Sequence, residues 1–206
     1  MKFSRGMTLV ELLIAMAIVV VLVAFAVQGF SGWVRNMSVR STAESVLSGL
    51  QIARSEALKR NTTMHFQLVT TLTEGCALAV AGPHWVVSQR GVSSKCNLDP
   101  ANPSVPADPG TSTGSETSTG SETNNPFIFQ RYDGSNAFNG GVTIKAGHND
   151  FTFNGLGNLT TIDEPEYIDI GVKEGEGWKN YLRIHVLPGG GARMCNPASS
   201  IDTQKC

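Results

Sequence analysis

A long uncharged stretch near the N-terminus constrains this chain more than any other feature. Leu12–Val34 carries no charged side chain over 23 positions, and Leu12–Val27 holds no polar side chain. About 20 apolar residues in a helix span the ~30 Å hydrocarbon core of a bilayer. The stretch exceeds the apolar part of a secretory signal, and no small-x-small cleavage site closes it. It predicts a membrane anchor, with Lys2 and Arg5 cytoplasmic and the C-terminal bulk exported.

The rest of the composition indicates an exported, β-rich domain. The 206 residues have a formal net charge of −1, are 41% hydrophobic and include 22 glycines. From Arg35 onward there are 14 basic and 16 acidic residues, a net of −2. This balance excludes a strongly basic chain built for nucleic acid, because phosphate neutralisation needs several basic side chains.

Glu11 is out of place in a plain anchor, because a carboxylate within a membrane span is costly. Either it lies close enough to the interface to be tolerated, or it pairs with a positive charge inside an assembly. The segment Gly6-Met7-Thr8-Leu9-Val10-Glu11 resembles the class III signal of type IV pilins and type II secretion pseudopilins. This resemblance implies that a prepilin peptidase cuts after Gly6 and N-methylates Met7, although Met7 replaces the usual phenylalanine. It also implies that Glu11 pairs with the new amine of a neighbouring subunit.

Apolar residues at helical spacing continue beyond the uncharged stretch. No proline occurs before Pro83, so we expect one helix from Met7 to Arg60, roughly 80 Å long at 1.5 Å per residue. Its second half should pack on a sheet through a narrow apolar stripe. The stripe consists of Val39, Ala43, Val46, Leu50, Ala53 and Ala57.

Short β-prone segments separated by Gly, Asn and Asp follow the helix, which predicts an α+β fold. We expect a long N-terminal α-helix, half of it transmembrane, packed on an antiparallel β-sheet, as the resemblance to type IV pilins also implies. Cys76–Ala81 and Trp85–Val87 should form a hairpin across Gly82-Pro83. The other expected strands are Thr62–Val69, Phe127–Phe129, Val142–Lys145, Phe151–Phe153, Ile168–Val172 and Tyr181–Leu187.

The expected organisation has three parts. Residues 1–6 form a leader, residues 7–34 a transmembrane or filament-core helix, and residues 35–206 a periplasmic head. The head divides into a half-helix at 35–60 and a β-sheet domain at 62–206. Within it, 97–126 is rich in proline and repeats Ser-Thr-Gly-Ser-Glu-Thr, which predicts a disordered surface loop. This loop is either a tolerated insertion or a glycosylated or partner-contacting segment.

Three further segments resemble the GspH/FimT branch of minor pilins and pseudopilins. They are Gln51–Asn61, Phe153–Gly157 and Tyr181–Pro197. The branch implies a minor pilin that primes a type IV pilus and sits in a tip complex with other minor pilins and the major pilin. It implies a single-pass inner-membrane protein of a Gram-negative bacterium that moves into the filament or its tip. The alternatives are a GspH-type pseudopilin of type II secretion and a DNA-binding minor pilin for transformation.

DNA binding ranks below protein docking. Some members of the branch bind DNA through a Gly-Arg-x-Arg turn, whereas this chain has Gly190-Gly191-Ala192-Arg193 and lacks the first arginine. Arg193 is the remaining candidate for a DNA contact. The hairpin Tyr181–Cys195 is instead expected to contact partner pilins.

Four cysteines lie in the exported part, where disulfides are expected. They permit three pairings, and proximity favours Cys76–Cys96 and Cys195–Cys206 over the other two. One bridge with two free thiols is the other possibility. The cysteine spacing fits no metal site.

The sequence contains no known catalytic motif. It has no G-x-S-x-G, H-E-x-x-H or Walker loop, and its four histidines are scattered. Acidic residues between Asp163 and Glu176 could hold a cation, but a solvated loop explains them better. We therefore expect no enzymatic activity, no cofactor and no small-molecule substrate.

Overall fold

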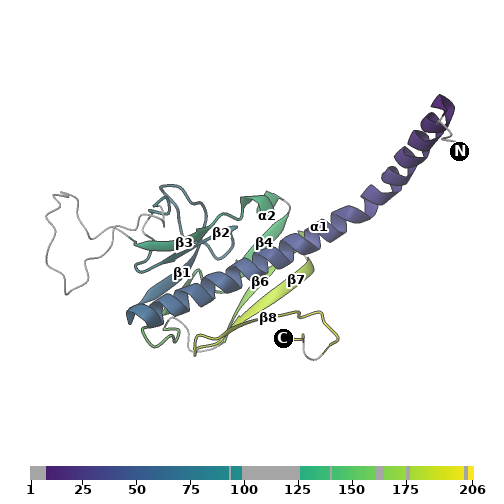
Figure 1. The fold of residues 1–206 in the computed structure, drawn as a ribbon. Coiled ribbons are helices and arrows are strands. Elements are labelled where there is room, and N and C mark those ends of the chain that lie inside the picture. The colour runs from purple at the N-terminus through teal and green to yellow at the C-terminus, as the bar shows by residue number, and fades with distance from the viewer. Residues whose placement is uncertain are drawn as a thin grey trace, which may run out of the picture. The chain divides into compact units, whose positions relative to one another are not determined.

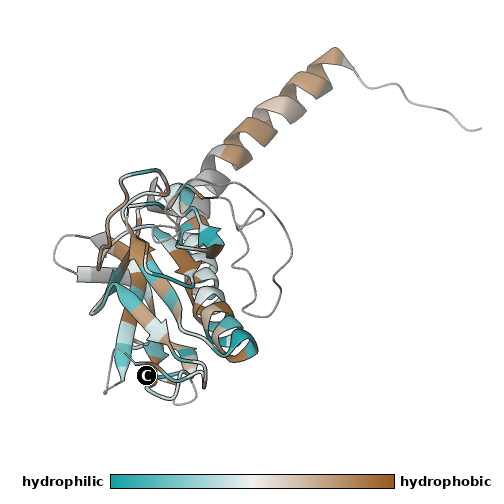
Figure 2. Ribbon diagram, turned by 90° about the vertical axis from the view of Figure 1, so that its left-hand side faces the viewer, coloured by the Kyte–Doolittle hydropathy of each residue, from teal (hydrophilic) through white to brown (hydrophobic). Residues whose placement is uncertain are grey.

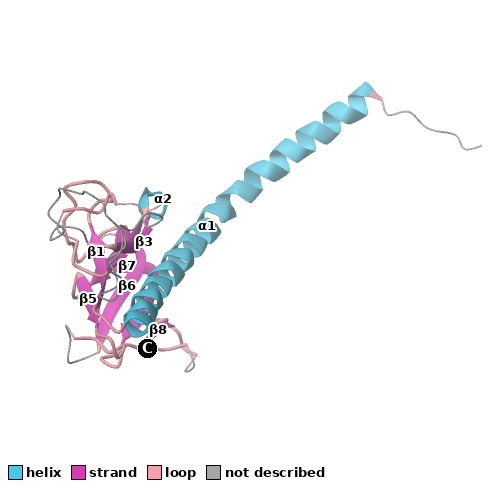
Figure 3. Cartoon of the chain, turned by 60° about the vertical axis from the view of Figure 1, so that its left-hand side comes forward, coloured by secondary structure: helices cyan, strands magenta, loops and turns pink. Residues whose placement is uncertain are grey.

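The computed structural model describes residues 8–92, 94–98, 126–139, 141–160, 165–174, 177–201 and 204–206. The expected leader, including Gly6, and Met7 lie outside these residues, as do residues 99–125 of the expected loop. The chain divides into two compact units, Met1–Met37 and Ser38–Cys206. Figures 1 and 3 show the long helix and the strands that follow it in the chain. The elements are α1 (Leu9–Arg60), β1 (Met64–Val69), β2 (His84–Ser88), β3 (Ile128–Tyr132), α2 (Ser135–Asn139), β4 (Val142–Ala146), β5 (Asp150–Phe153), β6 (Glu166–Glu174), β7 (Gly177–Val186) and β8 (Ala192–Cys195).

The helix α1 starts at a capped N-terminus. The Thr8 hydroxyl accepts a hydrogen bond from the Glu11 backbone N–H at 3.3 Å, and the Thr8 carbonyl accepts one from the Leu12 N–H at 3.2 Å. Thr8 is therefore the N-cap and Glu11 is the third helical residue. At this position the positive end of the helix dipole stabilises a carboxylate. No helix among the described residues meets the length and hydropathy of a candidate membrane span.

In the head, α1 contributes its apolar stripe to the core. All six stripe residues are at most 2% exposed. They belong to one hydrophobic cluster that also includes Phe66, Trp85, Ile170 and Ile184 of the strands. The spacing of the stripe thus predicted which helix face is buried, and α1 ends at Arg60 as expected.

A glycine allows α1 to approach the strands closely. A Cβ atom added at Gly49 would lie 2.7 Å from the Phe66 ring and 2.9 Å from the Trp85 ring. The Trp85 indole N–H donates to the Ser45 hydroxyl of α1 at 3.1 Å, which satisfies the polar atom of a 1% exposed side chain. The helix is therefore held against β2 by packing and by one hydrogen bond.

The strands form two antiparallel sheets, where one sheet was expected. The first has the order β3-β2-β1-β5 and the second β4-β6-β7-β8. The α+β class, with a long helix on antiparallel strands, is confirmed. Alternation of apolar residues indicates which side chains face the core but not which strands are neighbours. The division into two sheets was therefore not visible in the sequence.

The expected hairpin across Gly82-Pro83 is wrong. The strand β2 pairs with β1, from His65 opposite Ser88 to Val69 opposite His84. The segment before it crosses between the sheets: the Ala79 N–H donates to Leu68 at 3.0 Å, and the Val80 carbonyl accepts from Ala146 at 2.8 Å. Leu78 and Val80 are 40% and 45% exposed, so their alternation does not mark a core-facing strand.

Candidate functional site

The first candidate site is the exposed apolar half of α1. The large apolar side chains from Leu9 to Val23 are between 50% and 76% exposed. Figure 2 colours much of this part of the helix as hydrophobic. Glu11 is exposed in its first turn, and Gly6 and Met7 lie outside the described residues. Contiguous apolar surface on this scale marks a membrane or protein contact.

The second candidate site is the outer face of the second sheet. Arg193 of β8 lies opposite His185 of β7, and His185 lies opposite Tyr167 of β6. The next row pairs Arg183 with Asp169. Because Ile168, Ile170 and Ile184 between them face the core, these polar and aromatic side chains share the outer face.

Aromatic and ionic contacts order this outer face. The Tyr167 and His185 rings stack with centroids 4.7 Å apart, and the Arg183 guanidinium lies 4.7 Å from the Tyr167 ring centroid. Arg183 also binds Asp169 through two hydrogen bonds, Nε to Oδ1 at 2.6 Å and Nη2 to Oδ2 at 3.0 Å. The aspartate hydrogen bonds raise the pKa of Arg183. The two charges offset each other, which weakens this row as a phosphate site.

The imidazole of His185 is held neutral near physiological pH. Burial lowers its pKa from the ordinary value of 6.5, and the nearby Arg193 and Arg183 charges lower it further. Its Nε2 atom is buried without a hydrogen-bond partner in the described part of the chain. Arg193 is exposed, and the pair of rings beside it supplies apolar surface rather than positive charge.

The turn after β7 is held against α1. The Arg54 side chain donates from Nε to the Gly157 carbonyl and from Nη2 to the Gly189 carbonyl, each at 3.1 Å. The Leu159 N–H donates to the Pro188 carbonyl at 2.8 Å. Arg54, Gly157 and Gly189 fall in three segments that are far apart in the sequence and share a resemblance to the GspH/FimT branch. Arg54 thus connects the helix to one turn from each sheet, which sequence analysis did not reveal.

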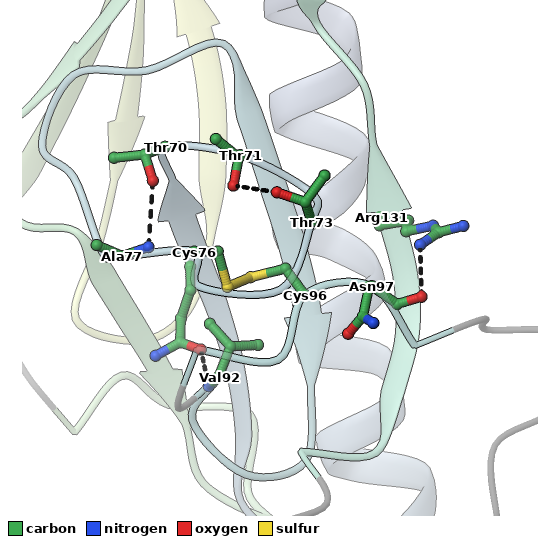
Figure 4. The surroundings of a disulfide bond; sticks show 10 residues. Thr70, Thr71, Thr73, Cys76, Ala77, Val92, Cys96, Asn97 and Arg131 are labelled. Atoms are coloured by element: carbon green, nitrogen blue, oxygen red, sulfur yellow. Dashed lines mark hydrogen bonds between the residues drawn. A yellow bond between two sulfur atoms is a disulfide. The ribbon is translucent and has the colours of Figure 1, made fainter.

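Each of the two disulfides joins cysteines that are consecutive in the sequence: Cys76 with Cys96, and Cys195 with Cys206. Cys76 and Cys96 are buried and link the segments that follow β1 and β2 (Figure 4). They belong to a satellite cluster with Val69, Val86, Val92 and Ile128. Cys195 of β8 forms a disulfide with Cys206, which is exposed. The second bridge therefore fastens the tail to the hairpin.

The histidines lie apart and serve local contacts. His65 Nδ1 lies 3.1 Å from an Asp150 carboxylate oxygen, and His148 Nδ1 lies 3.1 Å from a Glu166 oxygen. Within the described ranges, no group of three or more His, Cys, Asp or Glu side chains could hold a metal ion.

Comparison with known proteins assigns the family. Residues 42–164 match the family model described as type II transport protein GspH, and residues 1–27 match the prokaryotic N-terminal methylation motif. No curated protein matches the chain. Two crystal structures of the type IV minor pilin FimU from Pseudomonas aeruginosa are similar. One is 16% identical, with 79% of this chain and 97% of that chain covered and a TM-score of 0.45. The other is 17% identical, with 80% and 92% covered and a TM-score of 0.47. Because the GspH model covers more than half of its length, the chain belongs to the GspH family of minor pilins and pilin-like pseudopilins.

Proposed function

We propose that this protein is a minor pilin of a type IV pilus that helps to prime filament assembly within a tip complex. The exposed apolar half of α1 carries the proposal. Leaving such side chains in water is unfavourable by about 25 cal/mol per Å² of apolar surface. A bilayer can cover this surface before assembly, and the helices of other pilins can cover it afterwards. The N-terminal methylation motif supports this sequence of events.

Maturation is the first step of the proposal. A prepilin peptidase cuts between Gly6 and Met7 and methylates the new Met7 amine. Intact-mass measurement of the protein from cells with and without the peptidase tests this step. A mature N-terminus beyond the apolar stretch would contradict it.

Glu11 has a role in assembly in this proposal. Packed apolar helices exclude water, so its carboxylate needs a positive partner, which the Met7 amine of an adjacent subunit supplies. We expect Glu11→Ala to leave membrane insertion intact and to reduce co-purification with other pilins. Glu44→Ala is the control, because Glu44 lies on the same helix and pairs with the exposed Arg40 at 2.8 Å. Equal co-purification of both variants would contradict the assignment.

The outer face of the second sheet, formed by the β7–β8 hairpin and the neighbouring β6, is the proposed contact with other minor pilins. Three features of this face favour protein docking over phosphate binding. They are the stacked Tyr167 and His185 rings, the ion pair in which Asp169 offsets the charge of Arg183, and the disulfide that fastens the tail to the hairpin. Gel shifts of the full chain with duplex DNA test this choice, with Arg193→Ala compared against Arg40→Ala. Tight binding that weakens steeply with salt and is lost only in Arg193→Ala would establish DNA as the ligand instead.

A GspH-type pseudopilin of type II secretion is the second candidate, and the description of the matching family model favours it. Deletion of the gene separates the two functions. Loss of surface pili and twitching supports the minor pilin, whereas loss of protein secretion with normal pili supports the pseudopilin.

A further inference from the structure

The exposed apolar surface of α1 ends in an aromatic residue. Trp33 is 56% exposed, Val34 is 41% exposed and Met37 is 52% exposed. Trp33 and Met37 are four residues apart, so they lie on one face of the helix. Trp33 is the first tryptophan or tyrosine in the chain, and Arg35 is the first charged residue after Glu11.

The position of Trp33 along the helix matches the thickness of a bilayer. Glu11 and Trp33 are 22 residues apart, which corresponds to about 33 Å at 1.5 Å per residue. The hydrocarbon core of a bilayer is about 30 Å thick. A helix with the Glu11 carboxylate at one boundary therefore places the Trp33 indole at the other boundary.

The chemistry of the residues after the apolar run also fits this boundary. Tryptophan is enriched at membrane interfaces, because its ring is apolar and its N–H is polar. The exposed Arg35 follows two residues later, where a guanidinium can reach lipid phosphates. The compact head begins at Ser38, and Val39 is 2% exposed within its core. Trp33–Met37 thus forms a short exposed segment between the apolar run and the folded head.

We propose that Trp33 anchors α1 in the outer interface of the bilayer before assembly. It thereby sets how deeply the helix of the unassembled subunit is inserted in the membrane. The partner is the lipid headgroup region rather than the helix of another pilin. This inference rests on the membrane insertion in the proposed function.

Tryptophan emission in vesicles of phosphatidylcholine and phosphatidylglycerol tests the proposal. The full chain is reconstituted at high lipid excess, with bromine on the acyl chains either near the headgroup or near the chain end. The Trp33 signal is the difference between the wild type and Trp33→Leu. This subtraction removes the emission of the other two tryptophans, Trp178 and Trp85, of which Trp85 is 1% exposed inside the head. We expect stronger quenching by bromine near the headgroup, and loss of this quenching in Trp33→Leu.

A matched variant calibrates depth. Leu22→Trp in the Trp33→Leu background moves the indole 11 residues back, about 16 Å toward the bilayer centre. Its emission should be quenched more by bromine near the chain end. If the protein floats with the vesicles and Trp33 is unquenched, or is quenched mainly by chain-end bromine, the interface assignment fails while the anchor stands. Failure to float with vesicles would overturn both the anchor and this inference.

Discussion

Gly190 occupies a position in the β7–β8 turn that no other residue fits. Its φ is +76°, and an added Cβ would lie 1.9 Å from the Gly157 carbonyl oxygen. We predict that Gly190→Ala lowers the free energy of unfolding by about 2–3 kcal/mol, because strain and a steric clash combine. Gly189→Ala is the control, since nothing lies within 4 Å of its added Cβ. Thermal unfolding of both variants checks this, and equal losses would contradict it.

The lowered pKa of His185 makes the stability of the head depend on pH. Burial, Arg193 and Arg183 lower the folded-state pKa from the ordinary value of 6.5. The unfolded chain therefore takes up the proton first, and stability is lost as the pH falls below 6.5 toward the folded pKa. We predict that His185→Phe, which retains a ring beside Tyr167, reduces this acid sensitivity. Urea unfolding across this pH range measures it, with His148→Gln as the exposed control. An unchanged pH profile in His185→Phe would refute the prediction.

Arg54 joins α1 to the turns of both sheets. Its two hydrogen bonds involve a charged donor, and losing such bonds costs about 1.5–3 kcal/mol each. We predict that Arg54→Ala speeds amide hydrogen exchange in the Asn154–Leu159 and Leu187–Gly191 turns more than in the core strands. Arg40→Ala should change little, because Arg40 is 71% exposed and its pair with Glu44 is a surface salt bridge. Equal exchange in both variants would show that Arg54 does not hold the turns.

The elements differ in how well the sequence predicts them. The helix stripe follows from its helical spacing, and β4 follows from the alternation of buried and more exposed side chains. By contrast, β1 and β5 are buried along most of their length, so their β-prone residues predicted them better than alternation did. The short helix α2 was missed, since five residues carry no reliable period. The Arg54 contacts were also missed, because they depend on carbonyl groups that turns bring together across 103 and 135 residues.

The fold class of the chain could be predicted from the sequence, whereas the pairing of residues from distant segments on one surface could not. The signal motif and the apolar run indicated a pilin-like protein, and the three downstream segments indicated the GspH/FimT branch. The stacking of Tyr167 on His185 depends on the register between β6 and β7, which alternation alone does not fix. From the sequence, the hairpin Tyr181–Cys195 was identified as a candidate docking surface, but the contribution of Tyr167 and Asp169 from β6 was not.

The two disulfides should contribute unequally to the stability of the whole head. Cys76 and Cys96 are 3% and 0% exposed, and their bridge closes a segment of 20 residues within the folded domain. Removing this bridge raises the conformational entropy of the unfolded chain but leaves the native cluster ordered. The double variant Cys76→Ser with Cys96→Ser should therefore lower the free energy of unfolding by about 3 kcal/mol.

The Cys195–Cys206 bridge lies at the end of the chain, and the backbone hydrogen bonds described for residues 196–205 stay within that tail. Removing this bridge lets the tail move in the folded protein as well as in the unfolded chain. The entropy gained in the folded state therefore offsets the entropy gained in the unfolded state. We predict that Cys195→Ser with Cys206→Ser shifts the melting temperature much less than the first pair does, while exposing the tail to proteolysis. Calorimetry and limited proteolysis of the two double variants measure these effects. Equal shifts in melting temperature would show that the tail is an integral part of the folded head.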